Sequence, residues 1–210
     1  MNSGLAFDAA LRRGRGVPEL VGVDEAGRGP LAGPVVVAAV RLGPEDCGGL
    51  EGVRDSKLLS AGRRESLFDV IRRRARAVSL AWAHPRAIER DNILSATLGA
   101  MRRAALRAAG SGSAACLVVV DGNREIPGLL LPQLAVVAGD RRSLAVACAS
   151  VVAKVVRDRW MRRLDRNFPG YGFLRHKGYG TAAHLEALRR LGPSPLHRRT
   201  YAPVRELLPL

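Results

Sequence analysis

Cysteine, lysine and long apolar runs are scarce in this 210-residue sequence. The few cysteines argue against a disulfide-stabilised protein, and the lack of long apolar runs argues against a membrane-spanning one. The three cysteines, Cys47, Cys116 and Cys148, are odd in number and widely spaced. This spacing matches neither a disulfide framework nor a cysteine metal site. Cys116 and Cys148 lie in apolar runs and are expected to be small core residues. No stretch is long enough to span a bilayer.

The first sixteen residues lack the apolar h-region of a signal peptide, so we expect a cytoplasmic protein without a membrane partner. The length fits one domain, or one domain with an appendage. With 47% hydrophobic and 25% charged residues, the composition suits a globular protein with a substantial core. We expect it to be a monomer.

Positive charge is abundant, and almost all of it is arginine. The net charge is +15, and Lys57, Lys154 and Lys177 are the only lysines. A strongly basic chain favours a polyanionic partner such as nucleic acid. An arginine- and alanine-rich composition can also reflect coding bias, so the charge alone does not identify the partner.

The pattern of apolar residues predicts an α/β domain whose sheet need not be all parallel. Strands are predicted at residues 19–24, 34–42, 77–83, 116–120 and 134–138. Helices are predicted at residues 62–74, 85–109 (with Asp91-Asn92 as a candidate break), 143–167 and 182–191, with Ser60, Ser143 and Thr181 as caps. Residues 1–18 are polar and broken by glycines, and they are expected to form a loose tail.

The stretch VGVDEAGRGPLAGP, residues 21–34, organises the rest of the chain. Asp24 and Glu25 follow a short strand, and Gly27 and Gly29 allow a sharp turn and the close approach of another molecule. Neighbouring side chains on an ideal strand point to opposite faces. The two carboxylates are therefore expected to share a site only if the chain leaves regular strand geometry, or if Glu25 uses its backbone carbonyl. The alternative is a plain turn with a solvated acidic pair.

Acidic residues stand where three apolar strands end: Asp24-Glu25 after VGV, Asp121 after CLVVV, and Asp140 after LAVVAG. Carboxylates gathered at one edge of a sheet would repel one another, and a divalent cation would remove that cost. Mg²⁺ prefers oxygen ligands and keeps positions for phosphate oxygens, and two such ions can activate water and stabilise a leaving oxygen. The alternative is that all of these residues are solvated turn residues.

Longer motifs resemble those of the ribonuclease HII (type 2 ribonuclease H) family. They are, in order, GVDEAGRGPLAGPVVVAAV, DSKLLS, DNILSATLGAM, VVVDGN, GDRRSLAVACASVVAKVVRDRWM and YGFLRHKGYGTAAH, and they span roughly residues 20–201. The resemblance implies a ribonuclease H-like α/β fold: a mixed five-stranded sheet flanked by helices, with a helical C-terminal extension. It also implies cleavage of the RNA strand of RNA–DNA hybrids and of single ribonucleotides embedded in duplex DNA.

The same resemblance assigns roles to individual residues. Asp24, Glu25, Asp121 and Asp140 match the family's catalytic acidic residues, which would bind two Mg²⁺ or Mn²⁺ ions. In-line attack of a metal-bound water would leave a 5′-phosphate and a 3′-hydroxyl. Gly27-Arg28-Gly29 matches the family's GRG motif, which contacts the ribonucleotide 2′-hydroxyl largely through backbone.

Three further residues match substrate-contacting positions of the family. Tyr179 matches a tyrosine that packs on the sugar after the cleaved junction; a loop aromatic packed on the core is the alternative. Lys57 and Lys177 resemble substrate contacts, with a solvated lysine as the alternative. His176 and His184 are interpreted as structural or phosphate-facing, and Asp158 as an ion-pair partner.

The sequence departs from the family pattern at a few positions. Ala138 replaces the frequent lysine before Gly139-Asp140, which puts one phosphate contact in doubt. Val146 and Cys148 interrupt a usually alanine-rich run. The short C-terminal tail contains no evident segment for binding a replication clamp.

We therefore expect a loose tail at 1–18, a catalytic domain at 19–168, and an extension at 169–210 that completes the substrate site. Two hypotheses compete with a hybrid-cleaving ribonuclease. One is another ribonuclease H-like DNA nuclease, against which the GRG and HKGYG motifs argue. The other is a catalytically silent hybrid-binding protein, against which the intact acidic set argues.

Overall fold

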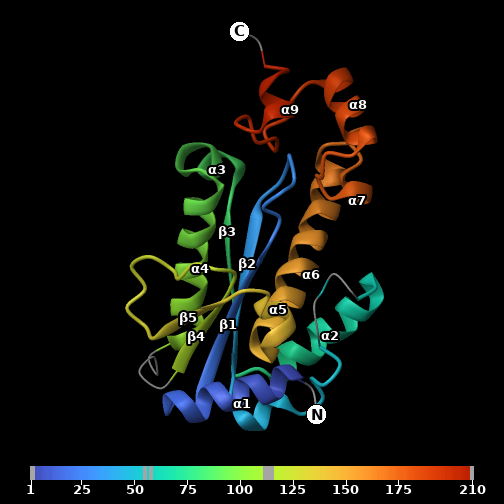
Figure 1. The fold of residues 1–210 in the computed structure, drawn as a ribbon. Helices are drawn as coiled ribbons and strands as arrows, with labels where there is room; N and C mark the ends of the chain where they lie inside the picture. Colours follow the sequence, from blue (N-terminus) through green and yellow to red (C-terminus); the bar gives the residue numbers. More distant parts are fainter. Residues whose placement is uncertain (1–2, 54–55, 57–58, 111–115, 209–210) are drawn as a thin grey trace.

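The structure is a computed structural model, and it describes residues 3–53, 56, 59–110 and 116–208 (Figure 1). Its elements are, in chain order, α1 (Ser3–Arg15), β1 (Glu19–Ala26), β2 (Val35–Leu42), η1 (Pro44–Cys47), α2 (Ala61–Arg74), β3 (Ala77–Ala83), α3 (Pro85–Asp91), α4 (Ile93–Ala109), β4 (Cys116–Asp121), β5 (Gln133–Val136), α5 (Gly139–Arg142), α6 (Leu144–Asn167), α7 (Phe173–His176), α8 (Ala182–Leu191) and α9 (Ala202–Arg205).

The strands form one mixed five-stranded sheet in the order β3-β2-β1-β4-β5. Strands β1, β2 and β3 pair antiparallel, whereas β4 pairs parallel with both β1 and β5. The central strand β1 therefore separates an antiparallel half of the sheet from a parallel half. This confirms the mixed, ribonuclease H-like sheet expected from the resemblance.

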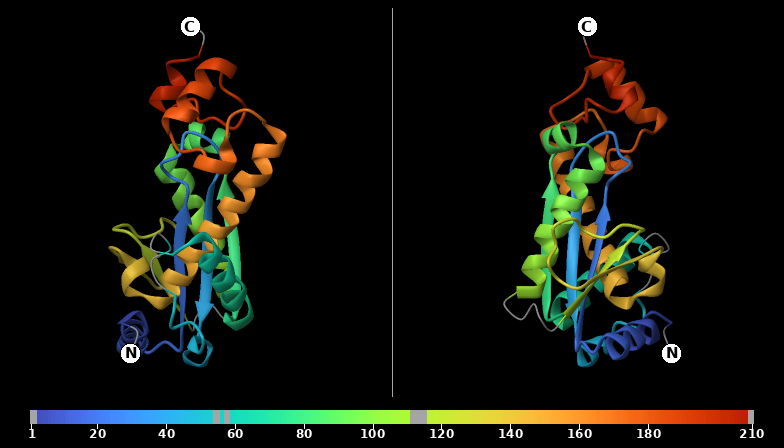
Figure 2. Two further views of the ribbon diagram at one scale, coloured as in Figure 1. Left: turned by 90° about the vertical axis from the view of Figure 1, so that its right-hand side faces the viewer. Right: turned by 60° about the vertical axis from the view of Figure 1, so that its left-hand side comes forward.

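Helices cover both faces of the sheet (Figures 1 and 2). On one face, Leu20 of β1 and Val40 of β2 pack with α6 and α2. On the other face, Val21 and Val23 of β1 pack with α4. Because β1 and β2 are covered on both sides, residues 20–23 of β1 and 35–40 of β2 carry no polar side chain, rather than alternating apolar and polar ones.

The C-terminal segment, with α7, α8 and α9, gathers at one end of the sheet around the β1–β2 connection (Figure 2). A third apolar cluster joins Leu31 and Ala32 of this connection to Met161 of α6 and to Phe173 and Leu188 of the C-terminal segment. The backbones are also joined by hydrogen bonds. The N–H of residue 31 donates to the carbonyl of 178 at 2.8 Å, and the N–H of residue 33 donates to that of 196 at 2.9 Å.

Local predictions of helix starts and of one helix break are confirmed. Ser60, Ser143 and Thr181 accept backbone hydrogen bonds as N-caps. The candidate break at Asp91-Asn92 is real, because Asn92 has a φ of +62° and its side chain caps α4. Among the described residues, no helix is long and apolar enough to cross a membrane.

The loose tail expected at residues 1–18 is wrong, because residues 3–15 form helix α1. Asp8 on this helix is 1% exposed, and its carboxylate accepts the N–H of Ala145 near the start of α6 at 2.9 Å. Leu5, Phe7 and Leu11 pack against the core formed with α6. Tertiary contacts therefore hold residues 3–15 in a helix, although the arginines and glycines in this segment weaken its helical pattern of apolar residues.

Gly22 brings the start of α6 close to β1, and its substitution should test this packing. A Cβ at residue 22 would lie 2.1 Å from the carbonyl carbon of Ala145 and 2.4 Å from the backbone nitrogen of Val146. We expect Gly22→Ala to lower the free energy of unfolding, measured in urea, by about 3 kcal/mol or more. Gly62→Ala is the control, because a Cβ there meets nothing within 4 Å and alanine favours the helix. Equal stability of the two variants would contradict this account.

Candidate active site

The candidate site lies where β1 and β4 part. Their parallel pairing ends at the pair Val23 and Val120. The next residue on each strand is an aspartate, Asp24 or Asp121. Open α/β sheets form a crevice at the carboxyl ends of strands where the topology changes. The carboxylates lie at this point because the apolar runs of both strands end there.

Asp24 and Glu25 both remain within regular strand geometry, so the departure from it, one of the two expected ways for them to share a site, does not occur. The ladder with β2 continues through the pairs Asp24–Ala38, Glu25–Val37 and Ala26–Val36. The two side chains face opposite sides of the sheet. They nonetheless share a site because β4 no longer closes the sheet beside them.

Two cavities meet at this opening. The one on the α6 side has a volume of about 250 Å³ and includes both acidic residues of β1, Asp121 and the turn 26–29. The one on the α4 side, also about 250 Å³, includes Glu25, Asp121 and residues of α4. Glu25 and Asp121 line both, so they connect the two sides of the sheet.

The backbone of Asp140, the fourth predicted carboxylate residue, lies next to Asp121. One carboxylate oxygen of Asp121, Oδ1, accepts the N–H of Gly139 at 2.7 Å and that of Asp140 at 3.4 Å. Asp140 is 4% exposed and does not line either of the two cavities. Ala138 precedes this pair with a φ of +54°, a left-handed conformation unusual for alanine.

The acidic residues carry an electrostatic cost in this arrangement. Burial raises the pKa of Asp24 well above its ordinary value, and the neighbouring charges of Glu25 and Asp121 raise it further. Burial also raises the pKa of Glu25, against the opposing effect of Arg28. Carboxylates in such surroundings favour a bound cation or proton.

Among the described residues, no three Asp, Glu, His or Cys side chains cluster tightly enough to hold one ion between them. The carboxylates instead line a shared space, which suits ions bound by one or two carboxylates with the remaining positions taken by water and phosphate oxygens. The donor set is all oxygen, as hard cations such as Mg²⁺ and Mn²⁺ prefer.

The turn after β1 depends on glycines, which have no side chain. Gly27 has a φ of +102°, and a Cβ there would lie 2.0 Å from Nε of the buried Arg157. Arg28 is exposed, and its guanidinium is 3.4 Å from Oε1 of Glu25. Tyr179 lies across the cavity, 3.8 Å from where a Cβ of Gly29 would be.

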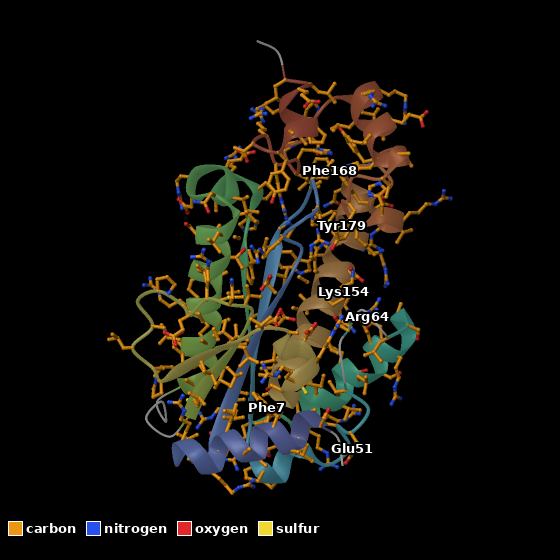
Figure 3. All side chains as sticks on the ribbon, viewed as in Figure 1. Phe7, Glu51, Arg64, Lys154, Phe168 and Tyr179 are labelled. Atoms are coloured by element: carbon orange, nitrogen blue, oxygen red, sulfur yellow. The ribbon has the colours of Figure 1, made fainter. Side chains whose placement is uncertain are left out.

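Tyr179 is 47% exposed and is not packed into the core, so that alternative is wrong (Figure 3). Stacked and bonded histidines hold its backbone. His184 Nδ1 lies 2.9 Å from the carbonyl oxygen of Tyr179, and His184 Nε2 lies 3.1 Å from His197 Nε2. His176 stacks on His184 at 4.3 Å between ring centroids. This confirms a structural role for His176 and His184.

Of the two lysines expected to contact substrate, the structure describes only Lys177. Lys57 lies outside the described residues. Lys177 does not line the cavity; its ammonium donates to the carbonyl of Leu174, and burial lowers its pKa. Asp158 pairs with Lys154 at 2.7 Å, which confirms its ion-pair role.

Several cavity residues were not predicted as site residues. Ser150, Lys154 and Arg157 of α6 line the cavity on the side of Asp24, and Lys154 is visible beside the strands in Figure 3. Ser150 Oγ is 2.9 Å from Oγ of Ser56, which also lines the cavity. The spacing of the three α6 residues at i, i+4 and i+7 was the available signal, because such residues share one helix face.

Comparison with known proteins agrees with this geometry. The family model for Ribonuclease HII matches residues 21–204. The chain belongs to the ribonuclease HII family. Ribonuclease HII of Albidiferax ferrireducens is 53% identical, over 90% of this chain and 88% of that protein. Ribonuclease HII of Syntrophotalea carbinolica is 52% identical, over 98% and 95% of the two chains. As a member of this family, the protein is a divalent-metal-dependent ribonuclease H that acts on RNA–DNA hybrids.

Solved structures support the same assignment. Ribonuclease H2 of Pyrococcus horikoshii has a TM-score of 0.73 at 25% identity, covering 90% of this chain and 96% of that one. RNase HII in its PCNA complex from Archaeoglobus fulgidus has a TM-score of 0.71 at 30% identity, covering 86% and 92%. Bst-RNase HIII in complex with Mn²⁺ shares the fold, with a TM-score of 0.71 at 16% identity over 90% and 68% of the chains.

Burial makes His197 a neutral residue under ordinary conditions. Its burial, with the nearby His184, lowers its pKa from 6.5 to about 4. An unfolded histidine takes up its proton near its ordinary pKa of 6.5. Unfolding at a pH between 6.5 and about 4 therefore binds a proton. The contribution of His197 to stability is therefore fully present above pH 6.5 and is lost as the pH falls toward about 4. We expect its imidazole NMR signals, assigned with His197→Gln, to titrate near the lower value; a midpoint near the ordinary value would contradict this.

Proposed function

We propose that the protein cuts the RNA strand of RNA–DNA hybrids and also cuts duplex DNA on the 5′ side of single embedded ribonucleotides. The products would carry a 5′-phosphate and a 3′-hydroxyl. One observation carries the proposal: Asp24, Glu25 and Asp121 line the same cavity as the turn 27–29 and Tyr179. The cavity therefore combines carboxylates for phosphate chemistry with backbone and aromatic groups for recognising a sugar.

Asp24, Glu25, Asp121 and Asp140 would hold two Mg²⁺ or Mn²⁺ ions in the catalytic complex. The raised pKa values of Asp24 and Glu25 support this role, since a cation would offset the cost of holding their charges in a buried site. When bound, such ions supply an activated water and stabilise charge on the phosphate and leaving oxygens.

The chain's own groups would position the substrate. The Gly27-Arg28-Gly29 turn would contact the 2′-hydroxyl, the group that distinguishes RNA from DNA. Tyr179 would pack on the sugar after the junction, for which its 47% exposure leaves a free ring surface. Lys57 and Lys177 would contact the substrate, Lys177 from outside the cavity wall, which itself includes Lys154. Residues 19–168 would then be the catalytic domain, and residues 169–210 the extension that completes the substrate site.

The direct test is cleavage of a labelled DNA duplex that contains one ribonucleotide, with Mg²⁺ or Mn²⁺ and with a chelator. We expect a metal-dependent cut on the 5′ side of the ribonucleotide and none in an all-DNA duplex. If only continuous hybrids were cut, the protein would still be a nuclease, but the proposed recognition of a single ribonucleotide would be excluded. No cutting of either substrate would favour a silent hybrid-binding protein.

Asp121→Asn should remove cleavage while leaving hybrid binding nearly intact. The amide keeps an oxygen that can accept the N–H of Gly139, but it lacks the charge needed to bind a cation. Glu125→Gln is the matched control, because Glu125 is exposed in the same loop, does not line either cavity and undergoes the same change of charge. Cleavage by Asp121→Asn at the control's rate would exclude Asp121 from the metal site.

A further inference from the structure

Arg198 is the most heavily bonded side chain near the candidate site, and it lies outside every motif considered above. It is 0% exposed, in the segment between α8 and α9. Its guanidinium donates to the carbonyl of Gly27 at 2.6 Å, to that of Arg28 at 2.7 Å, and to that of Gly33 at 2.9 Å and 3.1 Å. Tyr201 assists, because its hydroxyl donates to the Arg28 carbonyl at 2.7 Å and accepts from Arg198 at 3.1 Å.

These bonds fix the orientation of two peptide planes. In a trans peptide, the carbonyl of one residue and the N–H of the next point in opposite directions. The Gly27 carbonyl shares its peptide with the N–H of Arg28, and the Arg28 carbonyl shares its peptide with the N–H of Gly29. With both carbonyls bound by Arg198, these two N–H groups must point away from it.

The two N–H groups are available for a ligand. Neither has an acceptor within the described part of the chain, and Arg28 and Gly29 are both exposed. Arg28 and Gly29 line the cavity that also contains Tyr179. A pair of free backbone donors at an exposed turn can bind a hydroxyl or an anionic oxygen.

A guanidinium suits this task better than other side chains. It offers five donors in a rigid planar fork, whereas an ammonium is a compact point charge on a flexible stem. Among the described residues, Arg198 forms no ion pair with a carboxylate, so backbone carbonyls and the Tyr201 side chain solvate its charge. A buried charge without a counter-ion is costly to retain for packing alone.

We propose that Arg198 is a positioning residue that sets the ribonucleotide selectivity of the enzyme by fixing the N–H groups of Arg28 and Gly29 toward the 2′-hydroxyl. The inference rests on the proposed function, in which this turn reads that hydroxyl. Arg198 itself does not contact the substrate. Its removal should therefore affect discrimination between RNA and DNA more than general affinity for nucleic acid.

The test compares Arg198→Lys with Val204→Ala, because the Val204 side chain is 0% exposed at the same end of the chain but has no donor for the turn's carbonyls. Binding is measured in chelator to a duplex with one ribonucleotide and to the matched all-DNA duplex, alongside kcat and KM in Mg²⁺. We expect Arg198→Lys to lower the preference for the ribonucleotide duplex roughly tenfold and to lower kcat/KM by a similar factor, while all-DNA affinity stays within about twofold. Val204→Ala should keep the wild-type preference despite its loss of stability.

An unchanged preference in a folded Arg198→Lys protein would overturn the inference. If circular dichroism shows that this variant is unfolded, Tyr201→Phe replaces it, because it removes one donor to the Arg28 carbonyl and one acceptor of Arg198 but keeps the guanidinium. Tyr201→Phe should lower the preference by a smaller factor, and an unchanged value again overturns the inference. Absence of any preference in the wild-type protein would instead overturn the proposed function, and the inference with it.

Discussion

The end of the parallel pairing between β1 and β4 is the constraint on which the rest of the site depends. The two strands pair from Glu19–Cys116 to Val23–Val120, and after Glu19 both are buried and without polar side chains over this stretch. One residue later, β4 no longer covers the edge of β1, and the residues there are Asp24 and Asp121. A buried carboxylate is tolerable only with hydrogen bonds, a cation or access to water. The opening between the strands gives the two carboxylates access to water and to ions.

The antiparallel partner of β1 gives the opening its second property. Because β2 continues to pair with β1 through Ala26, the Asp24-Glu25 pair is held rigidly on opposite faces of a strand. Glu25 therefore reaches the cavity on the α4 side as well as the one on the α6 side. A rigid strand fixes carboxylate positions better than a loop would. The glycine turn begins only after both acidic residues have been placed.

The strands, the helix caps and the acidic ends of β1 and β4 could be predicted from the sequence, because each depends on neighbouring residues. Ser143 caps α6 with an oxygen three residues from the N–H it accepts, and the run CLVVV needs no distant information. Helix α1 could not be predicted, because its order depends on Asp8 meeting Ala145. Asp24 and Glu25 were predicted to share a site, but not on a strand that stays regular, because the end of the β4 pairing is a tertiary property. Arg198 lies in a proline-containing segment without periodicity, and nothing local distinguishes it from other arginines.

The buried arginines change the meaning of the chain's charge. Arg157 donates to the carbonyls of Pro34 and Ala32, at 3.1 Å and 3.3 Å, and Arg198 to those of Gly27, Arg28 and Gly33. Two cations thus hold the carbonyls of the β1–β2 connection, while its N–H groups at residues 31 and 33 bind the C-terminal segment. Burial lowers the pKa of Arg157 to about 10, which leaves it charged at neutral pH. Part of the net charge of +15 is therefore internal and shapes the turn rather than attracting nucleic acid. Glycine at residues 27 and 33 belongs to the same arrangement, since a Cβ there would collide with Arg157 or Met161.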